Sequence, residues 1–394
     1  FPGRTRRLAD EAAALREALS GPDAKLWRAA MIEELDSMKR LDVFRPLHGH
    51  ARPPASKGVV DTKWVFNLKR NEAGEIVRYK ARLVVRGYTQ VAGRDFLRTY
   101  AAVAEAMSVR TVLALAVLRG WGIFQIDVRT AYLNAPLDVD LYVKSTPEMR
   151  EAFDAPTADF LQMLRAVYGA KQSALCWSET LGNTLERTGL TRSHADPCVW
   201  SSSDVVLVIF VDDLIITFAK RAALDAIVAA LTSKYDITTD PDASLFVGLQ
   251  LERTPGALKI HQRNYLEELV ERTCMMNARP RRTPMETGTQ LPKLERTELS
   301  ASEHAAYQSL VGSLMYAATM TRPDISFAVG MLARHMLAPG HAHMHAAKHV
   351  VAYVASTLSL GVVIAIPETP LRNDELRLSA FADADHANDV DDRR

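Results

Sequence analysis

Residues 205–217 read Val-Val-Leu-Val-Ile-Phe-Val-Asp-Asp-Leu-Ile-Ile-Thr. Two apolar runs of strand length flank a pair of aspartates, and such runs are typical of strands buried on both faces of a sheet. The segment is therefore predicted to form a β-hairpin with Asp212 and Asp213 at its tip. Taken alone, an Asp-Asp pair is also a common turn sequence, so a purely structural interpretation stays open at this point.

A third aspartate, Asp127, lies near the end of a second short apolar strand, predicted over residues 123–128. A helix predicted over 108–118 and ended by Gly120 precedes this strand. Another helix, predicted over 166–188, separates the strand from the hairpin. Ionised carboxylates on apolar strands are costly to bury unless cations accompany them. Three of them in one place favour Mg²⁺, which takes oxygen ligands and accepts substrate phosphates in its remaining positions.

The composition excludes several classes of protein. The chain has 394 residues, of which 48% are hydrophobic and 24% charged, so it is expected to fold into two to four lobes. Lys and Arg number 48 and Asp and Glu 47, a net charge of +1, so any basic surface must be local. Three cysteines without paired spacing support neither a disulfide framework nor a cysteine zinc site.

No membrane span is expected, because the longest apolar stretches are far shorter than the roughly 20 residues that a membrane helix needs. The chain begins with Phe1 rather than Met, and no apolar secretory core follows. We therefore expect it to be a piece of a longer protein.

The local basic surface is predicted on a hairpin. Residues 57–94 contain nine basic and three acidic side chains. Two strands are predicted over 59–68 and 76–85, with a turn at 71–74 between them. Because side chains alternate along a strand, Arg78, Lys80 and Arg82 share one face. The row is interpreted either as a solvated sheet face or as a phosphate-binding surface.

The remaining chain alternates helices and strands and then becomes helical. An amphipathic helix is predicted near the N-terminus over 23–40, where Asp23 can cap its start. Later segments are predicted as helix 224–235, strand 245–251, helix 265–272, a Pro- and Gly-containing linker 279–300, a helical unit 302–360 and a strand 376–383.

Six segments resemble, in order and approximate spacing, the reverse transcriptase of copia-type LTR retrotransposons. The resemblance runs from Trp27 almost to the C-terminus. Its segments are Lys63-Trp-Val-Phe, Arg78-Tyr-Lys-Ala-Arg-Leu-Val, Gln125-Ile-Asp-Val-Arg-Thr-Ala-Tyr-Leu-Asn, Tyr168-Gly-Ala-Lys-Gln-Ser, Phe210-Val-Asp-Asp and Thr321-Arg-Pro-Asp-Ile.

The resemblance implies an α+β fold of the right-hand polymerase type with a βαββαβ-like palm. The implied division is an N-terminal lead segment 1–22, fingers, palm, a thumb with linker 255–300, a helical thumb or connection region 301–370, and a truncated start of a ribonuclease H domain 376–394. The fingers would comprise 23–99 with 137–167, and the palm 100–136 with 168–254.

The resemblance also implies the site. Asp127, Asp212 and Asp213 would be the catalytic carboxylates and would bind two Mg²⁺ ions, for which Mn²⁺ could substitute, with help from the Val128 carbonyl. The two ions would assist in-line transfer of a nucleotide to a primer 3′-hydroxyl.

Further positions would bind the substrates. Tyr132 would exclude a 2′-hydroxyl and so favour dNTP, although it could equally be a core aromatic. Gln172 would touch the incoming nucleotide, or else simply begin a helix. Arg82 and Lys69 would bind the triphosphate, since a guanidinium matches phosphate oxygens. Primer and template would lie on Arg78, Lys80, Gly248 and Gln250.

As partners the resemblance implies an RNA and DNA template–primer and dNTP. It further implies a larger polyprotein with protease, integrase and ribonuclease H segments. The expected location is the cytoplasm, in a virus-like particle, with nuclear entry of the product complex for DNA integration. Asp383 resembles the first ribonuclease H carboxylate, but the sequence ends before further acidic ligands, so this activity is expected to be absent from the fragment.

Three alternatives accompany this interpretation. The chain has Ala170, Ala135, Ala102 and Phe210 where the family usually has Leu, Gly, Pro and Tyr, so an inactive relic that binds nucleic acid is one alternative. A two-metal phosphohydrolase is a second. The third is a zinc site, because the spacing of His341, His345 and His349 places them on one helix face.

Overall fold

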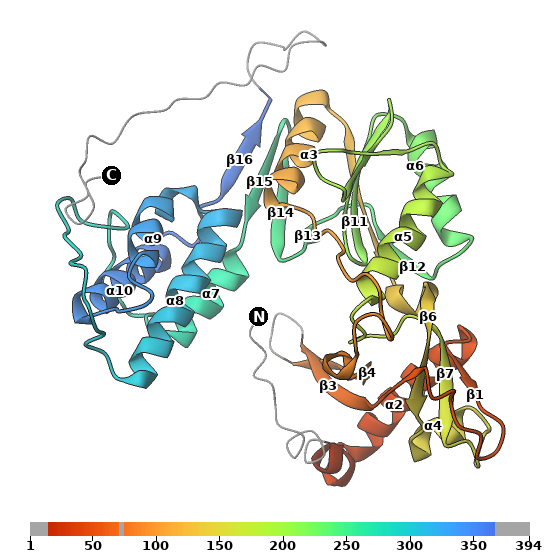
Figure 1. Ribbon diagram of the computed structural model, residues 1–394. Coiled ribbons are helices and arrows are strands. Elements are labelled where there is room, and N and C mark those ends of the chain that lie inside the picture. The colour runs from red at the N-terminus through yellow and green to blue at the C-terminus, as the bar shows by residue number, and fades with distance from the viewer. Residues whose placement is uncertain (1–14, 71–74, 367–394) are drawn as a thin grey trace. The chain divides into compact units, whose positions relative to one another are not determined.

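The computed structural model describes residues 15–70 and 75–366, and these divide into two compact units (Figure 1). The first unit contains the described residues up to Ala104 together with 126–214 and 220–239. The second contains 105–125, 215–219 and the described residues from Asp240 onward. The predicted fingers therefore lie in the first unit, whereas residues of the predicted palm belong to both.

The first unit begins with helix α2 (Ala24–Arg40), which packs on strand β4 (Ile76–Val85). The buried face of α2 carries Ala30, Met31, Leu35 and Met38, the spacing of a helix with one apolar side. Glu34 interrupts this face with a buried carboxyl group. The core beneath α2 thus contains one acid among hydrophobic side chains.

A four-stranded sheet shares this core. Its strand order is β1-β7-β6-β2, and the strands are β1 (Phe44–Pro46), β2 (Gly58–Val60), β6 (Pro136–Lys144) and β7 (Phe160–Arg165). The short helix α4 (Pro147–Ala152) connects β6 to β7, with Thr146 capping it through the amide of Met149.

Strands β3 (Thr62–Arg70) and β4 form the predicted basic hairpin. Their antiparallel register pairs Trp64 with Leu83 and Lys69 with Arg78. Residues 71–74, where a turn is predicted, lie outside the described residues. Along β4, Ala81, Leu83 and Val85 are buried while Arg78, Lys80 and Arg82 occupy the other face. The predicted row of three cations is therefore present.

A six-stranded sheet contains both predicted aspartate strands. Its order is β12-β5-β11-β10-β9-β8. The strands are β5 (Gly122–Val128), β8 (Thr191–Arg192), β9 (Val199–Ser201), β10 (Val205–Phe210), β11 (Asp213–Phe218) and β12 (Ile237–Asp240). Apart from the intervening β6, α4 and β7 and the edge strands β8 and β9, the chain order is β5, α5 (Ser173–Glu186), β10, β11, α6 (Arg221–Thr232) and β12. This chain order is the predicted βαββαβ pattern, and β5 lies next to β11.

The second unit contains helix α3 (Ala106–Arg119) and a sheet in the order β13-β14-β15-β16. Its strands are β13 (Leu245–Phe246), β14 (Leu249–Thr254), β15 (Ala257–His261) and β16 (Val362–Ala365). Val247 and Gly248, both with positive φ, form the two-residue turn between β13 and β14. The single strand predicted over 245–251 is therefore a hairpin.

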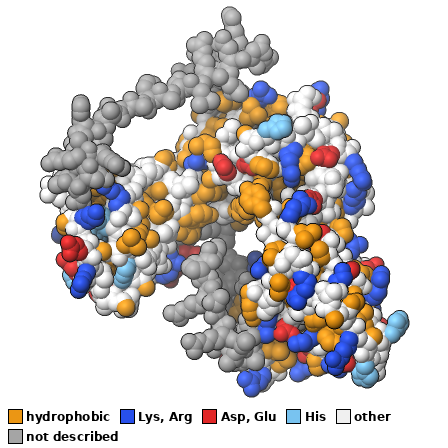
Figure 2. Space-filling model, in the orientation of Figure 1, with side chains coloured by type: hydrophobic (Ala, Val, Ile, Leu, Met, Phe, Trp, Pro, Cys, Tyr) orange, Lys and Arg blue, Asp and Glu red, His pale blue; other side chains and the backbone are white. Residues whose placement is uncertain are grey.

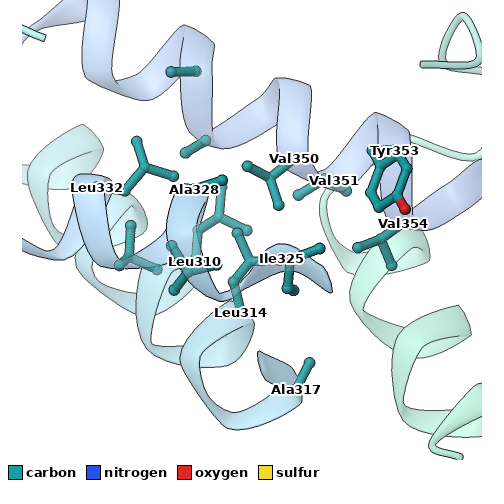
Figure 3. Packing of buried hydrophobic residues seen from close by; sticks show 14 of the residues in the cluster. Leu310, Leu314, Ala317, Ile325, Ala328, Leu332, Val350, Val351, Tyr353 and Val354 are labelled. Atoms are coloured by element: carbon teal, nitrogen blue, oxygen red, sulfur yellow. The ribbon is translucent and has the colours of Figure 1, made fainter. Parts of the chain in front are cut away.

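Four helices build the second core, which Figure 3 shows from close by. They are α7 (Arg263–Arg272), α8 (Ala301–Met320), α9 (Ser326–Ala333) and α10 (His341–Ser356). Leu310 and Leu314 of α8, Ala328 and Leu332 of α9, and Val350 of α10 point toward one another in this cluster. A capping box formed by Ser300 and Glu303 starts α8.

The Thr321–Ile325 motif is a buried polar junction in this unit. The Arg322 guanidinium is fully buried and donates two hydrogen bonds to Asp324, of 2.9 and 2.8 Å, and further ones to Thr357. Tyr353 also donates to Asp324, at 3.0 Å. The motif therefore ties the turn before α9 to the end of α10.

Most predicted elements are present, with shifted ends. The helix predicted over 166–188 is α5 alone, because Val167–Gln172 forms a turn in which Gly169 has a φ of +88°. Strands β6 and β7 and helix α4 were not predicted. The strand predicted over 376–383, including Asp383, lies outside the described residues.

Charged side chains of both signs are intermixed on the visible face of the molecule (Figure 2). The basic row on β4 is thus a local feature, as the near-neutral composition requires. Within residues 15–70 and 75–366, none of the helices has the length and apolar character needed to cross a membrane.

The Asp324→Asn variant should be less stable by about 3 kcal/mol, because it leaves the fully buried Arg322 charge without its paired carboxylate. Chemical denaturation measures the loss. The exposed Asp242→Asn variant of the same unit is the matched control and should change stability by less than about 0.5 kcal/mol. Equal stabilities for the two variants would contradict this role of Asp324.

Candidate active site

The turn between β10 and β11 is held in an unusual backbone conformation. Val211 has a φ of +61°, which a β-branched residue rarely adopts. The indole Nε1 of Trp177, a buried residue of α5, donates a 2.7 Å hydrogen bond to the Val211 carbonyl. Such conformations persist only where surrounding contacts impose them, and they cluster at functional sites. Helix α5 thus fixes the turn that presents Asp212.

A backbone hydrogen bond brings the other aspartate strand to this turn. The Val128 amide donates to the Asp212 carbonyl at 2.9 Å. Asp127 and Asp212 therefore lie next to each other on neighbouring chain segments. Burial, and after it the charge of Asp127, raise the pKa of the Asp212 carboxyl, while Arg82 and Lys80 act in the opposite direction.

Both carboxylates open onto a cleft of about 950 Å³ in the first unit. Strand β4 contributes its cation row to the same cleft, and α2 contributes Glu33 and Glu34. Further lining residues include Val128, Arg129, Thr130, Tyr168, Asp236 and Thr238. The cleft thus combines acids from four parts of the chain with five basic side chains, three of which belong to β4.

The third predicted carboxylate is placed differently. Asp213 begins β11 and is not among the residues that line the cleft. In the described part of the chain, no three His, Cys, Asp or Glu side chains come close enough together to form a metal site. Of the three predicted catalytic carboxylates, Asp127 and Asp212 therefore line the cleft and Asp213 does not.

The predicted phosphate-binding cations differ in their surroundings. The Arg82 guanidinium lies over the Tyr168 ring, 4.5 Å from its centroid, which holds it on the cleft. Burial, followed by the charges of Arg82, Lys69 and Arg78, lowers the pKa of Lys80. Arg78 is paired with Glu33 of α2. Lys69 is exposed on β3 and does not line the cleft.

Tyr132 and Gln172 occupy two different environments. Tyr132 packs against Tyr168, with the ring centroids 5.2 Å apart, and burial and the nearby Asp212 raise its pKa. Gln172 is fully buried, donates to the Asp95 carbonyl at 2.9 Å and accepts from Gln90 at 3.0 Å. The prediction that Gln172 touches the nucleotide is at odds with this placement, because its amide is used inside the fold.

The predicted primer-binding pair belongs to the second unit. Gly248 forms the β13–β14 turn with a φ of +79°. Gln250 exchanges two hydrogen bonds with Asn264, of 3.1 and 3.0 Å. Its side-chain amide thereby joins β14 to the start of α7.

The three histidines of the zinc hypothesis do not converge on a metal site within the described residues. His349 of α10 donates through Nε2 to the Thr283 carbonyl at 3.0 Å. His343, between them in the sequence, is buried and accepts the Gly340 amide through Nδ1 at 2.8 Å. His343 therefore caps the start of α10, and His349 ties α10 to the segment that contains Thr283.

Several residues that line the cleft were not identified from the sequence. Glu34 is 8% exposed, and its Oε1 has no hydrogen-bond partner in the described structure. Burial raises its pKa to about 7, against the charges of Arg82 and Lys80. The sequence pattern could have identified Glu34, because this acid occupies the apolar face of helix α2. It could not have identified Asp236 and Thr238, because their partners are distant in the sequence.

Residues 50–287 match the family described as reverse transcriptase (RNA-dependent DNA polymerase). The chain is 34% identical over 385 residues to the retrovirus-related Pol polyprotein from transposon RE2 of Arabidopsis thaliana, covering 96% of this chain and 25% of that protein. It is 30% identical over 397 residues to the corresponding polyprotein from transposon TNT 1-94 of Nicotiana tabacum, covering 98% of this chain and 29% of that protein.

A solved foamy viral protease–reverse transcriptase in complex with double-stranded DNA matches with a TM-score of 0.44 and 12% identity, covering 84% of this chain and 48% of that one.

The chain belongs to the reverse transcriptase (RNA-dependent DNA polymerase) family. The resemblance to the copia-type Pol polyproteins is confirmed. The chain spans about a quarter of the length of these curated relatives.

The buried Glu34 carboxyl predicts a pH-dependent stability. Its pKa of about 7 in the folded protein lies above its ordinary value of 4.5, so the folded state binds the proton more tightly than the unfolded chain. The contribution of Glu34 to the free energy of unfolding should therefore be complete below about pH 4.5. It should decrease as the pH rises through 7, by up to about 3 kcal/mol.

The Glu34→Gln variant should lack this decrease, and urea denaturation between pH 5 and 8 measures it. The Glu33→Gln variant, which changes the exposed neighbour, should keep the wild-type pH dependence. Parallel stability curves for wild type and Glu34→Gln would show that Glu34 is not the titrating group.

Proposed function

We propose that this chain is an RNA- and DNA-directed DNA polymerase that transfers nucleotides from dNTP to a primer 3′-hydroxyl. One observation carries the proposal. The backbone hydrogen bond between Val128 and Asp212 brings two carboxylates together on a cleft that also contains Arg78, Lys80 and Arg82. Acids that can bind a divalent ion, beside cations that can bind phosphate, are what phosphoryl transfer requires.

The donor set fits Mg²⁺. Asp127 and Asp212 offer hard oxygen ligands, and Val128, the last residue of β5, lines the same cleft and would help through its carbonyl. Burial and the neighbouring acid disfavour the ionised form of Asp212, so a cation there would relieve an existing repulsion. Mg²⁺ commonly takes one or two carboxylates together with waters and substrate phosphates. When bound, Mg²⁺ or its substitute Mn²⁺ would supply charge neutralisation at the transferred phosphate.

Asp213 starts β11 directly after Asp212, and successive side chains of a strand point to opposite faces. Asp213 also does not line the cleft. We therefore assign the metal-ligand role to Asp127 and Asp212, and Asp213 would complete the acidic cluster beside them.

The protein's own cations would bind the triphosphate. Arg82 is oriented by Tyr168, and a guanidinium can donate two parallel hydrogen bonds to phosphate oxygens. Lys80, next along the same face, is partly buried and, as predicted, would bind primer or template, adding a positive charge beside Arg82. Tyr132 packs beside Tyr168 and would contact the sugar, which favours dNTP over NTP.

The partners follow from the relatives. Retrovirus-related Pol polyproteins are larger than this chain, so we infer that it is one segment of such a polyprotein, with protease, integrase and ribonuclease H segments elsewhere. RNA and DNA template–primer would be its macromolecular substrate. Action in a cytoplasmic virus-like particle, with later nuclear entry of the product, belongs to the same proposal.

Primer extension with Mg²⁺ and dNTP tests the polymerase. The Asp212→Asn variant should lose extension by about 100-fold or more, because one of the two charges available to the metal is removed. The Asp225→Asn variant, which changes an exposed aspartate on α6, should extend normally. Equal extension by wild type and Asp212→Asn, or none by wild type, would defeat the proposal; the second result, with nucleic-acid binding retained, identifies an inactive relic.

Tyr132 should set the choice of sugar. Its replacement in Tyr132→Ala should reduce the preference for dNTP over NTP by about 10- to 100-fold, since the steric contact with a 2′-hydroxyl is lost. Tyr132→Phe keeps the ring and should retain the preference. Single-nucleotide incorporation with dNTP and NTP measures the ratio, and an unchanged ratio in Tyr132→Ala would exclude this role.

A further inference from the structure

Strand β12 lies beside β5 at the edge of the six-stranded sheet. The Arg129 amide donates to the Asp236 carbonyl at 2.9 Å, and the Arg129 guanidinium lies 3.5 Å from the Asp236 carboxylate. Asp127 lies two residues before Arg129, and Thr238 lies two residues after Asp236. This register brings Thr238 to Asp127 although the two are 111 residues apart.

The Thr238 hydroxyl Oγ1 donates a 3.2 Å hydrogen bond to Oδ2 of Asp127. Both residues line the cleft. An ionised carboxylate only accepts hydrogen bonds, and a hydroxyl donor at this distance restricts its rotation. The bond leaves Oδ1 available to another ligand.

We propose that Thr238 is a positioning residue that orients the Asp127 carboxylate for binding a divalent cation. The inference rests on the proposed function, because Asp127 is assigned there as a ligand. Hydrogen-bond partners of metal-binding carboxylates orient the ligand, and their loss weakens metal affinity or activity by 10- to 100-fold in general. Thr238 would act through Asp127 and not by contact with the substrate.

A merely structural role for Thr238 is separable from this one. Threonine is also a good strand residue because of its β-branched shape, which Thr238→Val preserves while removing the hydroxyl. Thr239, the next residue of β12, is an exposed threonine on the other face of the strand. Thr239→Val therefore controls for the same chemical change at the same strand.

The experiment measures Mn²⁺ binding to the 394-residue chain by electron paramagnetic resonance, without nucleotide or nucleic acid. Wild type, Asp127→Asn, Thr238→Val, Thr238→Ala, Thr238→Ser and Thr239→Val are compared, and circular dichroism checks their folding. The two hydroxyl-free Thr238 variants should bind Mn²⁺ about 10-fold more weakly. Thr238→Ser and Thr239→Val should bind as wild type does.

Primer extension over a range of Mg²⁺ concentrations gives the second measurement. Its Mg²⁺ midpoint should rise about 10-fold in Thr238→Val, with KM for dNTP unchanged at saturating Mg²⁺. If Asp127→Asn loses Mn²⁺ binding but folded Thr238→Val and Thr238→Ala retain it, the inference is overturned and the polymerase proposal stands. If Asp127→Asn binds Mn²⁺ like wild type, Asp127 is not a ligand and both fail.

Discussion

The hydrogen bond from the Val128 amide to the Asp212 carbonyl is the contact on which the site depends. It joins the end of β5 to the turn before β11, and it places Asp127 beside Asp212 on the same cleft. The turn itself has a strained backbone at Val211, which the Trp177 indole stabilises through the Val211 carbonyl. Two like charges are thus kept near one another by backbone geometry that the surrounding helix and sheet impose, and the stability of the fold offsets their repulsion.

Charge balance around these acids is shared between two elements that are far apart in the sequence. Strand β4 presents three cations, and helix α2 presents Glu33 and the buried Glu34 to the same cleft. Arg78 is paired with Glu33, whereas Arg82 is held by its stacking on Tyr168. Under the proposed function, a triphosphate would enter a cleft in which Arg78 and Arg82 are already oriented, so less side-chain entropy would be lost on binding.

Motif residues in this chain serve two different purposes. Asp127, Asp212 and Arg82 open onto the cleft, but Gln172 and Arg322 are fully buried. Gln172 is bonded to Gln90 and Asp95, and Arg322 to Asp324 and Thr357. Buried polar groups of this kind must be satisfied inside the fold, so their hydrogen-bond partners restrict which side chains these positions can hold. A motif that resembles a family therefore marks important positions without distinguishing a ligand from a structural contact.

The sequence by itself determined the elements whose signals are local: the acidic hairpin, the alternating cations of β4, the amphipathic helix α2 and the end of α3 at Gly120. Such features follow from the periods of helix and strand and from glycine's access to positive φ. Only the tertiary structure decided which acids meet. It brought Glu34, Asp236 and Thr238 to the cleft, left Asp213 off it and buried Gln172. These outcomes depend on strand order and register between segments distant in the chain, and side-chain periodicity within a segment contains no information about them.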